Sequence, residues 1–303
     1  MSQKYENMDF FQFQKRFSRE DSCWKHLVKL RWPDGFVCPR CGHDKAGFHR
    51  RRKLLQCKGC RYQASATAGT IFHKTKIPLR KWFWFIFLMS SQKTGVSIQG
   101  LQRLLGIKSY KTAWSMAHKV RKAMADRDAS YQLANLVEMD DSYFGPSGRG
   151  QRGRGTKGKV PVVVAVENRG KKPGFAAMRV VDNLKSAHIA HFAKSKIKEE
   201  QTVRTDGYVS YYCLSGHGYE LDMRIVGNGQ NASKELPWVH TLIANVKSML
   251  RGAHHGVSHK YLQRYLDEFC YRFNRRYWPS QLFNRLLKAA IVTPAFTYAE
   301  LSA

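Results

Sequence analysis

The residues best suited to chemistry are acids that lie within or beside apolar segments. Asp140 and Asp141 occupy the centre of Leu136–Phe144 (LVEMDDSYF), which predicts a β-strand, and Asp206 ends a shorter one, Thr202–Gly207. An acid in the middle of a strand is costly to bury unless it coordinates something. Neighbouring strand residues point to opposite faces, so only one of the first two acids can face a shared site. We favour Asp140, and interpret Asp141 as a surface charge.

Carboxylate oxygens are the ligands that Mg²⁺ and Mn²⁺ prefer, and pairs of such ions cleave phosphodiesters. A third ligand is expected on the predicted helix Ser233–Leu250. Asn245 lies at the edge of its apolar stripe, about 20° from Trp238 at 3.6 residues per turn. Glu235 projects towards the stripe and is the alternative third ligand. His240 and Lys247 project to the side of the helix away from the stripe. The stripe consists of Trp238, Leu242, Val246 and Met249.

Two pairs of cysteines form a separate cluster, Cys38–Cys41 and Cys57–Cys60, with 15 residues between the pairs. This spacing is typical of one tetrahedral zinc ion held by four thiolates. Four cysteines complete the ligand shell, so the site is predicted to be structural. Arg50, Arg51 and Arg52 lie between the pairs and are candidates for phosphate contacts.

The order of the surrounding elements suggests how the acids are brought together. Branched apolar runs at Lys159–Val166 and Phe175–Val181 predict two further strands, followed by a helix at Lys185–Lys198. The strand that ends at Asp206 comes next. Three strands, a helix and a strand that ends on an acid is the order of an RNase H-like nuclease fold.

Upstream, a helix after Pro78 is too apolar to face solvent and is predicted to be a core helix. Two shorter helices follow within Val96–Met124, separated by a turn at Gly106. This pattern is typical of a helix-turn-helix, and an ordinary helical hairpin is the alternative. In a DNA-binding motif, the second helix begins with Lys108, Ser109, Lys111 and Thr112.

The net charge of +30 makes a polyanion the first partner to consider; the alternative is a ribosomal or merely solubilising surface. Between Lys45 and Ala125 there are 18 Lys or Arg and no Asp or Glu. The Gly-rich segment 145–159 is predicted to be a flexible loop that becomes ordered on DNA, or else a hairpin tip with no role. Further candidates for DNA contact are Arg149, Arg152, Arg154, Arg275 and Arg276.

The N-terminal sequence bears on the cellular compartment of the protein. Residues 1–17 lack the apolar core of a signal peptide, and the longest apolar run, Trp82–Met89, is too short to span a bilayer. Paired cysteines without an export signal favour a reducing compartment. We therefore expect a cytoplasmic, nucleoid-associated protein.

Several motifs together resemble bacterial insertion-sequence transposases of the family numbered fifteen-ninety-five. The matching segments include CPRCGH, VEMDDSYFG, RTDGYVSY and HTLIANVKSMLRGAHHGVSHKYLQRYLDEFCYRFNRR. The resemblance implies a DDE-type nuclease with Glu or Asn in third place, and hence a catalytic set of Asp140, Asp206 and Asn245 with Mg²⁺ or Mn²⁺. Lys247 matches a basic residue that often follows the third ligand. Terminal inverted repeats, target DNA and assembly of several subunits are also implied.

These observations predict a multidomain α+β protein with an RNase H-like α/β catalytic domain. The expected divisions are an N-terminal segment at 1–19, a zinc ribbon at 20–76, a helix-turn-helix region at 77–129 and the catalytic domain at 130–303. The predicted activity is cleavage of DNA ends followed by strand transfer. Two alternatives are an inactive, transposase-derived DNA-binding regulator and a nuclease without joining activity.

Overall fold

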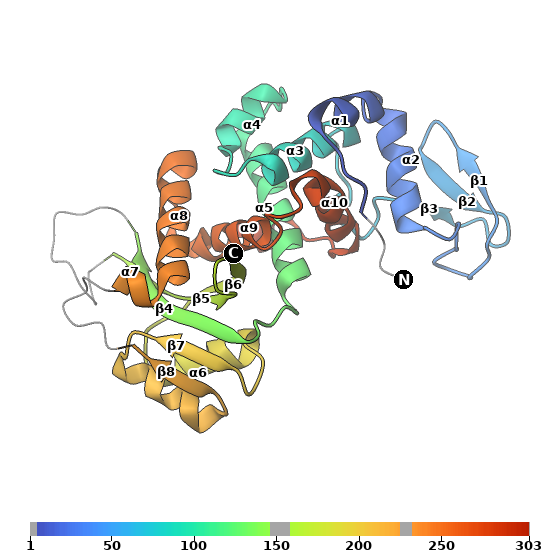
Figure 1. Cartoon of the computed structure of the whole chain (residues 1–303). Coiled ribbons are helices and arrows are strands. Elements are labelled where there is room, and N and C mark those ends of the chain that lie inside the picture. Colours follow the sequence, from blue (N-terminus) through green and yellow to red (C-terminus); the bar gives the residue numbers. More distant parts are fainter. Residues whose placement is uncertain (1–4, 146–157, 225–231, 303) are drawn as a thin grey trace. The chain divides into compact units, whose positions relative to one another are not determined.

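The computed structural model describes residues 5–145, 158–224 and 232–302 (Figure 1). It divides into two compact units, one of residues 1–127 with 277–303 and the other of residues 128–276. This division differs from the predicted domains at the C-terminal end, where we expected one domain to continue to residue 303. In the described part of the chain, no helix is both long and apolar enough to cross a membrane.

The first unit combines a small sheet with several helices (Figure 1). The antiparallel sheet has the order β1-β2-β3. The elements of this unit are α1 (Phe10–Arg16), α2 (Glu20–Arg31), β1 (Ala46–His49), β2 (Leu54–Cys57), β3 (Gln63–Ala64), α3 (Leu79–Ser91), α4 (Ile98–Leu104), α5 (Tyr110–Asp128), the short turn η3 (Pro279–Gln281), α10 (Leu282–Val292) and α11 (Tyr298–Ser302).

Aromatic rings form much of the core of this unit. Phe283 of α10 lies with its ring centroid 4.9 Å from that of Phe13 in α1 and 5.7 Å from that of Phe83 in α3. Such contacts add to the hydrophobic gain from burial. They explain why the C-terminal segment joins this unit, since α10 covers the apolar helix that was predicted after Pro78.

The two helices α4 and α5 flank a turn at residues 105–109. Gly106 adopts a left-handed conformation, φ 56°, that lets the chain leave α4, and the Lys81 ammonium donates a hydrogen bond to its carbonyl. Most of α5 beyond its first turn is buried or half-buried, whereas Lys108, Ser109 and Lys111 are exposed. The beginning of α5 is therefore its most exposed part.

The second unit is built on a five-stranded sheet of order β6-β5-β4-β7-β8. The central strand β4 is antiparallel to β5 and parallel to β7, and β7 is parallel to β8. This is the RNase H-like arrangement that the sequence predicts. The elements are β4 (Leu136–Phe144), β5 (Val160–Asn168), β6 (Pro173–Val180), α6 (Ser186–Lys196), β7 (Thr202–Thr205), η1 (Val209–His217), β8 (Glu220–Met223), α7 (Ala232–Glu235), α8 (Pro237–His254), η2 (His259–Tyr261) and α9 (Leu262–Phe273).

Each face of this sheet is covered by its own layer. Val162, Val164 and Val166 of β5 point to the face where α8 and α9 pack, whereas Val163 and Ala165 point to the face of α6 and η1. Figure 1 shows α8 and α6 on opposite sides of the strands. β5 is buried on both faces, which explains the continuous apolar run seen in its sequence.

Candidate functional site

The central strand β4 carries polar groups on the face that α8 covers. Glu138, Asp140 and Ser142 alternate with residues that point to the opposite face, and Glu138 is fully buried while Asp140 is 8% exposed. On the other face, the Tyr211 hydroxyl donates to Asp141 at 3.3 Å. Asp140 and Asp141 thus point to opposite faces, as their adjacent positions in a strand require.

Strand pairing brings Asp206 beside Asp140. β4 and β7 run parallel, with Val137 opposite Val203 and Glu138 opposite Arg204. Continued by two residues, this register sets Asp140 opposite Asp206, just beyond the last residue of β7. Neighbouring strands lie about 4.8 Å apart, so this register puts the two acids at neighbouring positions beyond the end of β7.

Glu138 fixes the start of α8. Its Oε2 atom accepts hydrogen bonds from the backbone N–H groups of Trp238 and Val239, at 2.8 and 2.9 Å. Its Oε1 atom accepts one from the Asn168 side chain at 2.7 Å. A carboxylate at a helix N-terminus satisfies donors that the helix itself leaves unpaired. Burial raises the pKa of Glu138, although these hydrogen bonds oppose the rise.

With its start held by Glu138, α8 brings two side chains to the polar face of β4. His240 Nδ1 lies 3.8 Å from Asp140 Oδ2, and Lys247 Nζ donates to Ser142 Oγ at 2.6 Å. Burial lowers the pKa of His240, and the charge of Asp206 opposes that shift. Burial also lowers the pKa of Lys247, which nearby Lys159 and Arg251 lower further. The site therefore contains two carboxylates, an imidazole and an ammonium group.

The three acids also affect the pKa of one buried tyrosine, Tyr211. Burial raises the pKa of Tyr211 well above its ordinary value, and the charges of Asp141, Asp140 and Asp206 raise it further. Tyr211 therefore stays protonated and donates to Asp141 from below the sheet. The sequence analysis did not identify this tyrosine, since nothing in the segment YVSYY distinguishes it from its neighbours.

Asn245, the third ligand predicted from the sequence, lies on a different edge of α8 from His240, and its role as a ligand stays a prediction. Asn245 is exposed, and about 140° of helix rotation separates it from His240. Glu235 precedes α8, and its Oε2 atom lies 4.0 Å from Arg224 Nε. The interpretation of His240 and Lys247 as residues of the far side was wrong. The buried face of α8 is bordered by two edges. Trp238 lies on one edge, where its indole N–H donates a hydrogen bond of 3.1 Å to the Gly170 carbonyl. His240 and Lys247 lie on the other edge.

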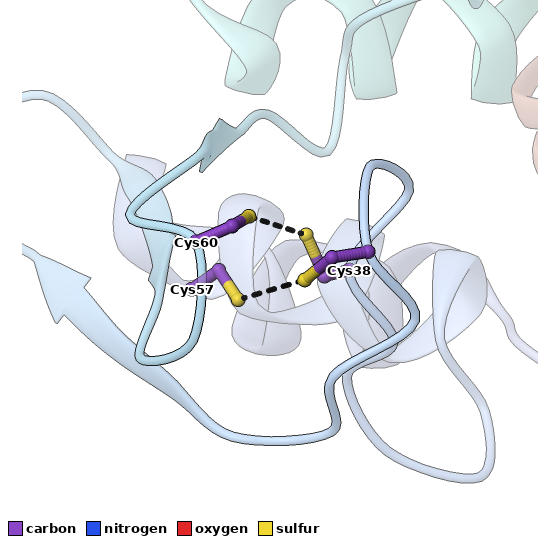
Figure 2. A group of neighbouring side chains, drawn as sticks. Cys38, Cys57 and Cys60 are labelled. Carbon is purple, nitrogen blue, oxygen red and sulfur yellow. Dashed lines mark hydrogen bonds between the residues drawn. The ribbon is translucent and has the colours of Figure 1, made fainter.

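Only the cysteines form a compact cluster of metal-ligating residues among those the structure describes. The Sγ atoms of Cys38, Cys41, Cys57 and Cys60 all lie within 4.8 Å of one another. The Sγ atoms lie 3.7 Å apart in the pair Cys38–Cys60 and 3.6 Å apart in the pair Cys41–Cys57. Figure 2 shows Cys38, Cys57 and Cys60 pointing toward one another. Four thiolates at 2.3 Å from a tetrahedral zinc ion have sulfurs about 3.8 Å apart. The donor set and spacing fit a structural zinc ion.

The ribbon is joined to α2 by an aromatic contact. Trp24 lies with its ring centroid 4.5 Å from that of Phe48, and its indole N–H donates to the Lys53 carbonyl at 3.0 Å. Arg50, Arg51 and Arg52 are exposed in the turn between β1 and β2. Their position fits the predicted contact with phosphates.

The remaining predicted DNA contacts have different environments. Thr112 is half-buried on α5, and Arg149, Arg152 and Arg154 lie outside the described residues. Arg275 is 4% exposed and forms an ion pair of 2.5 Å with Asp128, so the expectation that it contacts DNA was wrong. Arg276 is half-buried and donates to the carbonyls of Pro173, Gly174 and Phe273.

Comparisons with known proteins match both units. The ISXO2-like transposase domain matches residues 132–274, and a transposase zinc-ribbon domain matches residues 18–63. A Halobacterium salinarum protein described as an uncharacterized protein in transposable element ISH50 is 27% identical over 278 residues, which cover 84% of this chain and 91% of that protein.

Two solved structures show weak similarity to the chain. A pre-cleavage Mos1 transpososome is 9% identical with a TM-score of 0.30, over 64% of this chain and 74% of that one. The Mos1 Strand Transfer Complex is 12% identical with a TM-score of 0.31, over 66% and 74%.

Proposed function

We propose that this chain, which belongs to the insertion-sequence transposases of family fifteen-ninety-five, cleaves the DNA ends of its element and joins them to a target. The membership agrees with the resemblance seen in the motifs. The observation that carries the proposed chemistry is the parallel register of β4 and β7, which sets Asp140 opposite Asp206 under His240 of α8.

Asp140, Asp206 and His240 are the residues we propose to hold divalent ions. Carboxylate oxygens suit Mg²⁺ and Mn²⁺, whereas an imidazole suits softer ions, so this set favours Mn²⁺ more than three carboxylates would. When bound, the ions activate the attacking oxygen and stabilise the leaving oxygen. Among the described residues, the trio is more widely spread than the cysteine cluster.

The protein's own groups prepare the site for this reaction. Burial lowers the pKa of His240, so its ring is neutral at pH 7 and has a nitrogen lone pair available to a metal ion. Lys247 lies beside Ser142, two residues from Asp140 on the same strand face, where an ammonium group attracts the scissile phosphate. Glu138 does not touch DNA in this proposal; it orients α8.

DNA binding is assigned to the first unit. The exposed Arg50–Arg52 turn of the zinc ribbon and the exposed start of α5 are the proposed contacts with terminal inverted repeats. The net charge of +30 supports a polyanionic partner. Joining two ends to one target requires at least two active sites, so we propose a homo-oligomer on DNA.

The test is incubation of the protein with DNA that flanks its own gene, in Mg²⁺ or Mn²⁺. Cleaved ends and joined products are expected from the wild type, and neither from Asp140→Asn, which should bind the same DNA. Cleavage without transfer of a pre-cut end indicates a nuclease. Sequence-specific binding without cleavage in either metal indicates a regulator.

A further inference from the structure

A cavity of about 640 Å³ lies at the end of the central strand β4, which carries Asp140. Its walls come from the end of β4, the start of β5, the last two turns of α8 and the segment that leads into α9. Three cations line it, namely Lys159, Lys247 and Arg251, together with His255 and His259. No carboxylate is among its lining residues in the described chain.

The cavity also has an apolar wall. This wall consists of Leu250, Val257 and Leu262, and Lys247 Nζ lies 5.3 Å from the ring centroid of Phe144, which also lines the cavity. Clusters of cations attract phosphates, while apolar and aromatic surfaces receive the face of a base. Its volume lies within the range of about 300–1,000 Å³ typical of small-molecule sites, which accommodates one nucleotide.

Position connects the cavity to the reaction. Lys247 lines it and also donates to Ser142, two residues along β4 from Asp140. A DNA strand whose phosphate lies at Asp140 therefore has its next nucleotide within reach of Lys159 and Arg251. Duplex DNA cannot present a base to such a cavity without unpairing it.

We propose that this cavity binds one unpaired nucleotide of the DNA strand, adjacent to the phosphate at the acids. This inference rests on the proposed function, because it assumes that DNA reaches Asp140. The cations bind the phosphate of that nucleotide, and the wall of Leu250, Val257 and Leu262 receives its base. The site thereby selects ends that are frayed or distorted over intact duplex.

The test measures binding of a single-stranded tetranucleotide containing 2-aminopurine, by its fluorescence, to the full chain without added Mg²⁺ or Mn²⁺. Arg251→Glu reverses a lining charge, and Val257→Trp fills the cavity while keeping every charge. Lys260→Glu is the matched control, because Lys260 is exposed on the neighbouring turn but does not line the cavity. Thermal unfolding of each variant checks that it remains folded.

We expect both cavity variants to weaken tetranucleotide binding about tenfold or more, and Lys260→Glu to change it less than threefold. An abasic tetranucleotide with the same phosphates should bind the wild type about tenfold more weakly. Equal binding of abasic and intact strands overturns the base-binding cavity, as does equal weakening by Lys260→Glu and Arg251→Glu.

The outcome also separates this inference from the proposed activity. Asp140→Asn should abolish cleavage and leave tetranucleotide binding within threefold of the wild type. A wild-type protein that cleaves and joins DNA but binds the tetranucleotide with no dependence on Arg251 or Val257 refutes the cavity alone. Cavity-dependent binding without cleavage by the wild type refutes the transposition reaction and leaves the nucleotide site standing.

Discussion

Glu138 provides the sharpest prediction about how the fold positions the site. It is fully buried and accepts three hydrogen bonds, two of them from the first turn of α8. Hydrogen bonds to a charged group contribute about 1.5–3 kcal/mol each, and each buried donor left unpaired costs about 1–3 kcal/mol. Glu138→Ala should therefore destabilise the second unit by about 3–5 kcal/mol, and Glu138→Gln, which keeps the shape, by about 1–2 kcal/mol.

The effect on activity should exceed the effect on folding. Glu138 holds the helix turn that precedes His240, and misplacement of a reacting group by about 1 Å costs about 100-fold in rate. We expect Glu138→Gln to lower strand transfer per folded molecule at least about tenfold. The assay combines urea unfolding with single-turnover strand transfer, and corrects the rate for the folded fraction.

A matched control lies in the first unit. Glu20 accepts hydrogen bonds from the backbone N–H groups of Leu79 and Arg80 at 2.7 and 2.9 Å, and so caps α3 as Glu138 caps α8. Glu20→Gln should lower stability but leave the transfer rate per folded molecule within threefold. The reasoning is refuted if both variants lower that rate equally, or if neither does.

Three further outcomes are expected elsewhere in the chain. Cys57→Ser, or removal of zinc by a chelator, should unfold the ribbon, seen as lost circular dichroism and lost DNA binding with the second unit intact. Arg275→Ala should destabilise the protein by up to about 3 kcal/mol in urea, since it leaves the half-buried Asp128 without its ion pair and with a hydrogen bond of 3.3 Å from Asn274. Burial raises the pKa of Asp267 from 3.8 to about 6, so its contribution to stability is full below pH 3.8 and is lost as pH rises through 6. Asp267→Asn should therefore be more stable than the wild type at pH 7, and this advantage should vanish at pH 4. Its upper limit is about 3 kcal/mol, and partial exposure of the side chain reduces it. An advantage that does not change with pH contradicts this.

Strong local patterns were sufficient to predict much of the fold. The strand Leu136–Phe144 was predicted with its observed bounds, because its acids are framed by apolar residues at both ends. The four cysteines predicted the ribbon from spacing alone. β8, by contrast, was not predicted, since Glu220–Met223 has only four residues and no clear alternation.

The site was harder to predict because it depends on which edge of a helix meets the sheet. The apolar stripe of α8 has polar residues at both edges, Asn245 on one and His240 with Lys247 on the other. Periodicity gives the stripe but not the edge that faces β4. That choice is made by Glu138, a contact across 100 residues of sequence that no local pattern reveals. Similarly, Arg275 looks like part of a basic patch until its pairing with Asp128 is known.

The most direct test of the proposed site compares His240→Ala with Asn245→Ala in single-turnover transfer of a pre-cleaved element end, in Mn²⁺. The site built on Asp140, Asp206 and His240 predicts a loss of about 100-fold or more for His240→Ala, with folding retained. Asn245→Ala should stay within threefold of the wild type. A large loss for Asn245→Ala with His240→Ala near wild type would contradict the account.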